Sequence, residues 1–176
     1  LRASAVAALH RRYGVTGLPD DAVLPVIGTK ELIAWLPTLL GLGPDDMIVV
    51  PELAYPTYEV GAQLAGAQVA RADSLTQLGP QSPTLIYLNS PSNPTGNSFP
   101  VRDLREIAGQ LRDRAVVVID AAYIEFANDD PTCELLDEFD NVIVLRTLSK
   151  AMALAGARCG ALLAAPEVTS LLSCVL

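Results

Sequence analysis

The segment TLIYLNSPSNPTGNSFPVRDLREIAGQLRDRAVVVID, residues 84–120, contains a strand-like run, a helix-like run and a second strand-like run in succession. Residues 84–89 and 115–120 are short and apolar throughout, which is typical of strands covered on both faces. Between them, residues 101–112 place their apolar side chains on one helical face. Pro100 suits the first turn of this helix, because its missing N–H would have no partner there. The segment therefore predicts a parallel β-α-β unit.

The same alternation continues in both directions along the chain. A helix is expected to start near Thr29, and Pro37 should kink or break it before the Gly and Pro stop signal at residues 41–44. The apolar runs that we interpret as strands are residues 22–27, 47–50, 67–71, 84–89, 115–120, 141–146 and 158–164. This order predicts one three-layer α/β domain over residues 1–176, with a mostly parallel seven-stranded sheet.

Composition excludes several classes of protein. The chain has 176 residues, of which 51% are hydrophobic, so it can bury a core. Lys and Arg number 12 and Asp and Glu 20, which gives a net charge of −8 and no basic footprint for nucleic acid. No apolar stretch is long enough to span a bilayer, and the start has no signal-peptide pattern. We expect a soluble cytoplasmic protein that binds neither nucleic acid nor membrane.

The cysteines and the single histidine offer no metal site. Cys133, Cys159 and Cys174 form no CxxC pair, so we interpret them as small buried thiols in a reducing cytosol. His10 is expected to be solvated on a surface helix. One histidine and scattered cysteines make neither a zinc site nor a Ser-His-Asp triad.

Polar residues gather after the predicted strands, where ligands bind in open α/β sheets. Lys150 directly follows a strand and could attack a carbonyl to form a Schiff base, although a solvated loop lysine is the alternative. Asp120 ends an apolar run, so its carboxylate needs a strong partner, such as a protonated heteroaromatic nitrogen. The alternative for Asp120 is a helix N-cap.

Two other loops could bind a ligand. SPSNPTG, residues 90–96, has two prolines that restrict the backbone and fix the direction of Asn93, but it could also be an ordinary turn. Gly28 and Thr29 lie between a strand and a helix, where backbone N–H groups can hold a phosphate, although most such turns bind nothing. Arg158 could add a bidentate contact to the same phosphate.

Taken together, these motifs resemble the fold type I pyridoxal-phosphate-dependent aminotransferases, the aspartate aminotransferase superfamily, along the whole chain. SPSNPTG is similar to the Asn-Pro-Thr-Gly loop of that family, which implies that Asn93 contacts the phenolic oxygen of the cofactor. DAAY, residues 120–123, implies that Asp120 binds the pyridine nitrogen and Tyr123 the phenolic oxygen. TLSK, residues 147–150, implies that Lys150 holds the cofactor covalently and later moves a proton.

The resemblance also implies a place for the rest of the cofactor. Tyr55 matches the aromatic residue that stacks on the pyridine ring. The residues implied to bind the cofactor phosphate are Gly28, Thr29, Lys30, Thr147, Ser149 and Arg158.

The implied activity is amino-group transfer between an amino acid, or an amino-acid precursor, and a 2-oxo acid, in a homodimer. Residues 1–96 resemble N-succinyldiaminopimelate aminotransferases, whereas residues 97–176 are more similar to histidinol-phosphate aminotransferases. A natural or engineered chimera or an intermediate lineage would explain this. Ala121 stands where histidinol-phosphate aminotransferases usually have Glu.

The family pattern further implies that an N-terminal segment and a C-terminal small domain are absent from this chain. We expect their loss to expose apolar surface, with a sticky face formed by Leu171, Leu172, Val175 and Leu176. Two alternatives to an aminotransferase stay open: a folded fragment or chimera with no useful catalysis, and a carbon–sulfur lyase on the same fold.

Overall fold

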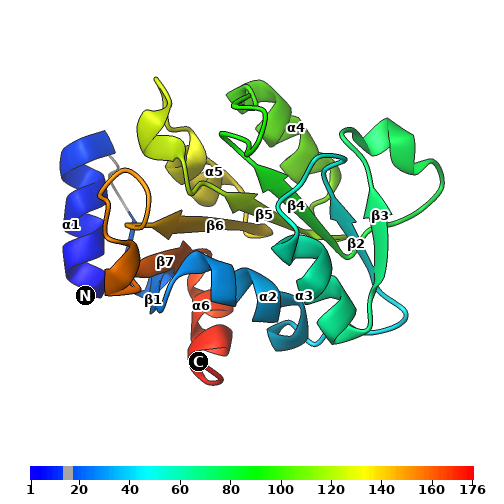
Figure 1. Ribbon diagram of the computed structural model, residues 1–176, viewed down its shortest axis with the longest axis horizontal. Coiled ribbons are helices and arrows are strands. Elements are labelled where there is room, and N and C mark those ends of the chain that lie inside the picture. The colour runs from blue at the N-terminus through cyan, green and yellow to red at the C-terminus, as the bar shows by residue number, and fades with distance from the viewer. Residues whose placement is uncertain (14–17) are drawn as a thin grey trace.

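The computed structural model describes residues 1–13 and 18–176 and shows helices and strands alternating along the chain (Figure 1). The strands are β1 (Val23–Val26), β2 (Met47–Val50), β3 (Gln68–Arg71), β4 (Leu85–Asn89), β5 (Val116–Asp120), β6 (Val142–Thr147) and β7 (Gly160–Leu163). The α-helices are α1 (Arg2–Tyr13), α2 (Thr29–Leu39), α3 (Thr57–Ala65), α4 (Val101–Gln110), α5 (Thr132–Glu138) and α6 (Pro166–Ser173). Each predicted strand is present, with its ends shifted by no more than two residues.

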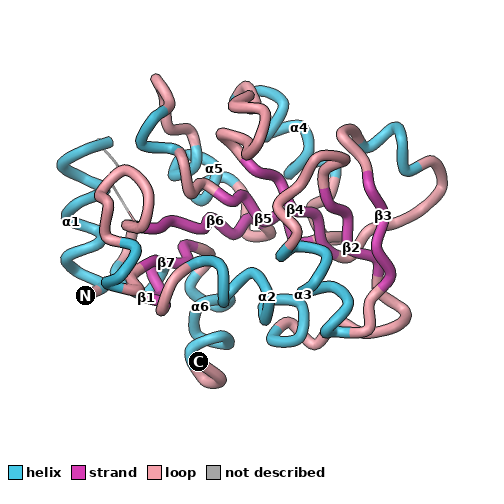
Figure 2. Tube along the Cα trace, in the orientation of Figure 1, coloured by secondary structure: helices cyan, strands magenta, loops and turns pink. Residues whose placement is uncertain are grey.

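The strands form one seven-stranded sheet in the order β1-β7-β6-β5-β4-β2-β3 (Figure 2). The pairs β2–β3, β2–β4, β4–β5 and β5–β6 are parallel. Strand β7 runs against its neighbours, pairing antiparallel with β6 and with β1. The prediction of a mostly parallel seven-stranded sheet is confirmed.

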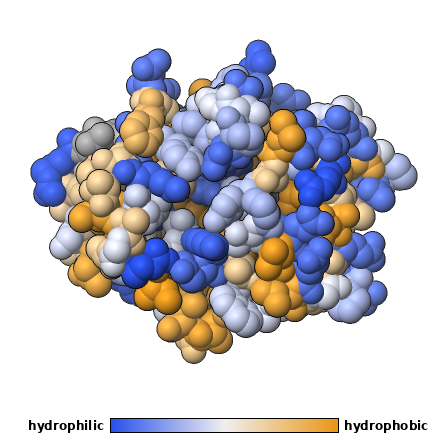
Figure 3. All heavy atoms as spheres, viewed as in Figure 1, coloured by the Kyte–Doolittle hydropathy of each residue, from blue (hydrophilic) through white to orange (hydrophobic). Residues whose placement is uncertain are grey.

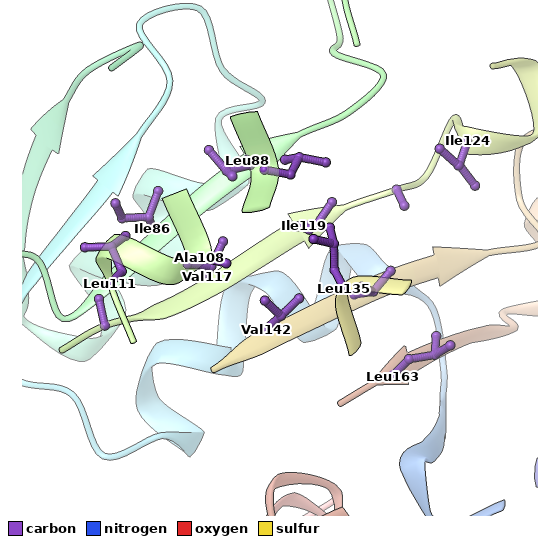
Figure 4. Close-up of a cluster of buried hydrophobic side chains, with 14 of the residues drawn as sticks. Ile86, Leu88, Ala108, Leu111, Val117, Ile119, Ile124, Leu135, Val142 and Leu163 are labelled. Atoms are coloured by element: carbon purple, nitrogen blue, oxygen red, sulfur yellow. The ribbon is translucent and has the colours of Figure 1, made fainter. Parts of the chain in front are cut away.

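Helices cover both faces of the sheet, so the fold has three layers (Figure 1). In β5, Val117 and Ile119 belong to a core that includes residues of α1, α4 and α5, while Val118 belongs to a second core with residues of α2, α3 and α6. Figure 4 shows part of the first core, including Ile86 and Leu163 from other strands. Apolar residues at consecutive strand positions therefore reflect burial on both faces.

Pro37 does not break α2, which was one of the two effects predicted for it. The helix continues to Leu39 with Pro37 inside it. A helical proline leaves the carbonyl four residues earlier without its N–H donor. Here that carbonyl belongs to Ile33, and it accepts a hydrogen bond from the Tyr87 hydroxyl at 3.2 Å. A side chain from β4 thus replaces the lost helical donor.

The predicted burial of the histidine and the cysteines is only partly correct. His10 is exposed on α1, as expected. All three cysteines are free, but only Cys133 is buried. Cys159 is half-buried and Cys174 is exposed, because it follows α6 at the surface. The expectation of buried thiols was therefore wrong for Cys174.

An apolar patch lies over α6 and the residues after it, at the lower edge of the face in Figure 3. Leu171, Val175 and Leu176 are each at least 60% exposed. Leu172 is fully buried in the core under α6, so its assignment to this exposed face was wrong. Among the described residues, no helix has the length and hydropathy needed to cross a membrane.

Candidate active site

A cavity of about 380 Å³ opens where β4, β5 and β6 end and where β1 leads into α2. It is the meeting point of separate stretches of the sequence. The residues singled out from the sequence all line it: Gly28, Thr29, Lys30, Tyr55, Asn93, Asp120, Tyr123, Thr147, Ser149, Lys150 and Arg158. Motifs that lie far apart along the chain are thus brought together by the parallel strands.

Asp120 forms the buried acidic wall of the cavity. Its side chain lies at the end of β5, and the residue is only 5% exposed. Oδ2 accepts a hydrogen bond from the Tyr58 hydroxyl at 2.7 Å, and Oδ1 accepts one from the Ala122 N–H at 3.1 Å. Burial raises the pKa of Asp120, while these two hydrogen bonds and the charge of Lys150 act to lower it. No helix cap is formed, so the carboxylate is available to a cationic partner in the cavity.

Tyr58 is a site residue that the sequence prediction missed. It is fully buried at the start of α3, and its ring stacks on that of Tyr87 with centroids 4.7 Å apart. Burial, together with the neighbouring Asp120, raises the pKa of Tyr58 far above that of a free tyrosine. The phenol therefore stays protonated and donates to Asp120. Its role depends on a contact with Asp120, 62 residues away in the sequence, for which the local sequence carries no signal.

The SPSNPTG loop is fixed to the end of the sheet by Asn89. This residue, also missed from the sequence, is 5% exposed at the last position of β4. Its Oδ1 accepts a hydrogen bond from the Asn93 N–H at 2.6 Å, and its Nδ2 donates to the Asp120 carbonyl at 3.0 Å. The backbone of Asn93 is thereby tied to the strand that carries Asp120, while the Asn93 side chain remains exposed.

One end of the cavity, here called the anion-binding end, combines features that favour an anion. Gly28, with φ of 113°, leads into the first turn of α2, where Thr29 is buried and the N–H groups have no capping side chain. A Cβ on Gly28 would lie 2.6 Å from Nη2 of Arg158, so a larger residue there would displace that guanidinium. Arg158 pairs with Glu31, which accepts hydrogen bonds from Nη2 at 2.6 Å on both carboxylate oxygens. A helix N-terminus next to an arginine is typical of a phosphate site.

Hydroxyl groups complete this anion-binding end. Thr147 is buried at the last position of β6, and its Oγ1 lies 3.0 Å from Oγ of Ser149. The Ser149 N–H also donates to Thr147 Oγ1, at 3.2 Å. Both residues line the cavity immediately before Lys150.

Lys150 and two tyrosines line the more open side. Nζ of Lys150 lies 5.1 Å from the centroid of the Tyr123 ring, a cation–π distance. Lys150 is exposed, so the structure does not show the desolvated lysine that the sequence suggested. Tyr55 is half-buried and meets Tyr58 edge to face, with centroids 6.2 Å apart.

The arrangement can be compared with that of known proteins. The family model for aminotransferase class I and II matches residues 2–175. The chain belongs to this family. Class I and II aminotransferases depend on pyridoxal phosphate, as the sequence motifs implied.

Relatives in this family resemble the chain over most of its length. A probable aminotransferase of Mycobacterium tuberculosis is 57% identical over 167 residues, which cover 91% of this chain and 40% of that protein. A histidinol-phosphate aminotransferase of Aeromonas hydrophila is 38% identical, over 91% of this chain and 48% of its own length. The chain thus spans less than half of these curated class I and II aminotransferases.

A solved structure in the same family gives a similar picture. A probable N-succinyldiaminopimelate aminotransferase from Thermus thermophilus superposes with a TM-score of 0.84 and 28% identity. The match covers 99% of this chain and 51% of that one. The M. tuberculosis relative matches both halves of the chain in a single alignment. The predicted difference between residues 1–96 and residues 97–176, each resembling another kind of aminotransferase, therefore stays a prediction.

Proposed function

We propose that residues 1–176 form the cofactor-binding large domain of a pyridoxal-phosphate-dependent aminotransferase. The observation that carries the proposal is that residues of four separate motifs, at Gly28, Asn93, Asp120 and Lys150, line a single cavity. The reaction would move an amino group between an amino acid, or an amino-acid precursor, and a 2-oxo acid. We also propose that parts of a homodimer outside residues 1–176 complete the substrate site, since these residues match less than half the length of the named relatives.

The residues present fit pyridoxal phosphate. The first turn of α2, Thr147, Ser149 and Arg158 would hold the phosphate, because that turn has no capping side chain and all three residues line the same cavity. Asp120, which is 5% exposed and accepts a hydrogen bond from the Tyr58 hydroxyl, would face the pyridine nitrogen. When bound, the cofactor supplies a ring that accepts electrons from the α-carbon of the substrate.

Each protein group has a separate task in this reaction. An ionised Asp120 would hold a proton on the ring nitrogen, and the buried setting would make this charge pair strong. The Lys150 amine would hold the cofactor covalently and would move a proton at the α-carbon of the substrate. Asn93 and Tyr123 would orient the ring through its phenolic oxygen, and Tyr55 would cover the ring face.

For the substrate, we propose an amino donor of the histidinol-phosphate or N-succinyldiaminopimelate type. The named relatives support both choices. The test is to mix the chain with each donor in turn, with 2-oxoglutarate as the acceptor, and to measure glutamate. Release of a thiol from a sulfur amino acid without any acceptor would instead indicate a carbon–sulfur lyase.

The first experiment is a visible absorption spectrum of the protein mixed with pyridoxal phosphate. We expect a yellow band that borohydride bleaches in the wild-type chain. Lys150→Ala should show no such band. Lys150→Arg is the matched control, because it keeps a cation near Tyr123 but cannot form the covalent bond. A well-folded wild-type chain without the band would contradict the proposal and leave a bare α/β domain.

A band without amino transfer would have a different meaning. It would keep the cofactor site and support a folded domain that binds the cofactor and catalyses nothing useful by itself.

A further inference from the structure

Pro37 leaves one carbonyl of α2 in need of a donor, and a tyrosine supplies it. The Ile33 carbonyl would bond to the N–H of residue 37, which proline lacks. The Tyr87 hydroxyl donates to this carbonyl at 3.2 Å. Tyr87 and Ile33 are each 1% exposed, so losing this donor would leave a buried carbonyl unpaired.

The same carbonyl is also where α3 comes close to α2. A Cβ on Gly61 would lie 2.7 Å from the Ile33 oxygen and 3.0 Å from the Ala34 oxygen. Gly61 is buried and lies in the middle of α3. The position of α2 is therefore fixed at Ile33 from two sides, by β4 through Tyr87 and by α3 through Gly61.

This contact point lies one helical turn from the anion-binding end of the cavity. Thr29 and Lys30 form the first turn of α2 and line the cavity, as does Ile33 itself. Ile33 and the first turn belong to consecutive turns of the same helix, so we infer that a shift at Ile33 is passed on to the first turn. The ring of Tyr87 stacks on that of Tyr58, which bonds to Asp120. Tyr87 thus contacts groups at both ends of the cavity without lining it.

We propose that Tyr87 is a positioning residue, whose bond to the carbonyl released by Pro37 holds the first turn of α2 at the correct height for the cofactor phosphate. This inference rests on the proposed function. It assigns Tyr87 to the phosphate end, in contrast to Tyr58, which supports Asp120 at the ring end.

The test compares pyridoxal phosphate with pyridoxal, which lacks the phosphate. Binding is measured by titration of the visible band for wild type, Tyr87→Phe and Tyr58→Phe. Tyr87→Phe should weaken binding of pyridoxal phosphate by about three- to tenfold, the effect of one buried hydrogen bond, and leave pyridoxal unchanged. Tyr58→Phe, the matched control from the same ring stack, should change the binding of both ligands alike.

Rescue separates positioning from a general loss of structure. Pro37→Ala restores an N–H at position 37, so the double variant Tyr87→Phe/Pro37→Ala should regain the wild-type preference for pyridoxal phosphate over pyridoxal. An unchanged preference in Tyr87→Phe, or a double variant that does not recover, would overturn the inference. The same holds if Tyr87→Phe fails to fold and Pro37→Ala does not restore folding, judged by circular dichroism.

Failure of the proposed function gives a different result. A folded wild-type chain that binds neither ligand would overturn the proposed function and the role of Tyr87 with it. Binding by wild type with no change of preference in Tyr87→Phe would overturn the role of Tyr87 alone.

Discussion

At the scale of single residues, Asp120 is placed where it lowers stability in the absence of a cationic partner. It is 5% exposed, and burial raises its pKa despite the hydrogen bonds from Tyr58 and Ala122. A buried carboxylate that binds a ligand is typical of a site where a group needed for function lowers the folding stability.

Asp120→Asn should make the cofactor-free chain more stable at neutral pH. A raised pKa means that the folded chain keeps its proton at pH values where the unfolded chain, with an ordinary pKa of 3.8, has lost it. Stability contributed by Asp120 is therefore complete below that ordinary pKa and is lost as the pH rises through the folded pKa. Asparagine does not titrate. The difference in the free energy of unfolding between variant and wild type should therefore increase as the pH rises.

Urea unfolding of both chains across this pH range measures the effect. If the difference in the free energy of unfolding is the same at all pH values, the Asp120 carboxyl is not the cause of the stability change. The same variant should lose amino transfer.

The residues that the sequence revealed are those that follow strands within contiguous motifs, such as Asp120 and Lys150. Tyr58 and Asn89 were missed because their roles depend on contacts across the fold. Tyr58 reaches Asp120 over a sequence separation of 62 residues. Neither spacing nor hydropathy encodes such a distance, whereas a polar end to an apolar run marks a strand end directly.

At the scale of elements, α2 and α3 approach each other closely at Gly61. The ideal Cβ position there is 2.7 Å from a backbone oxygen, which cannot swing away as a side chain could. Any residue larger than glycine must therefore separate the two helices.

Gly61→Ala should destabilise the chain by about 2 kcal/mol, because overpacking outweighs the better helix propensity of alanine. Gly109→Ala in α4 is the matched control, since its Cβ would meet only Phe139 Cε1 at an ordinary 3.7 Å. That variant should be stabilised by up to about 1 kcal/mol. Thermal and urea unfolding of both variants measure these changes, and equal effects would contradict the role given to the helix contact.

The sequence predicted the strands well but could not show that α2 continues past Pro37 without a break. Strand positions were recoverable because burial on both faces leaves continuous apolar runs bounded by Gly, Pro and charge. The effect of Pro37 was not, because the donor that compensates for it is Tyr87, a residue of a separate strand. Local rules describe what a proline removes from its own helix and not what the neighbouring layer provides.

At the scale of the whole molecule, protection from solvent should decrease from the centre of the sheet to its edge. All residues of β4 and β6 are buried, whereas the edge strand β3 has none buried. Native-state hydrogen exchange should therefore find the slowest amides in β4, β5 and β6, which exchange only through global unfolding. Amides of β3 should exchange by local opening, and equal protection of β3 and β5 would contradict this order.

The order of the strands also affects how the protein is made. β1 is synthesised early, yet its sheet neighbour is β7, and they pair from Val23 with Leu163 to Val26 with Gly160. During synthesis, β1 has no partner strand in the sheet until β7, the last strand, has been made. Pro25, which has no N–H to offer, limits mispairing of this edge with other nascent chains. Gly28 follows β1 and Arg158 precedes β7, so we expect the anion-binding end to be among the last parts of the site to form during translation.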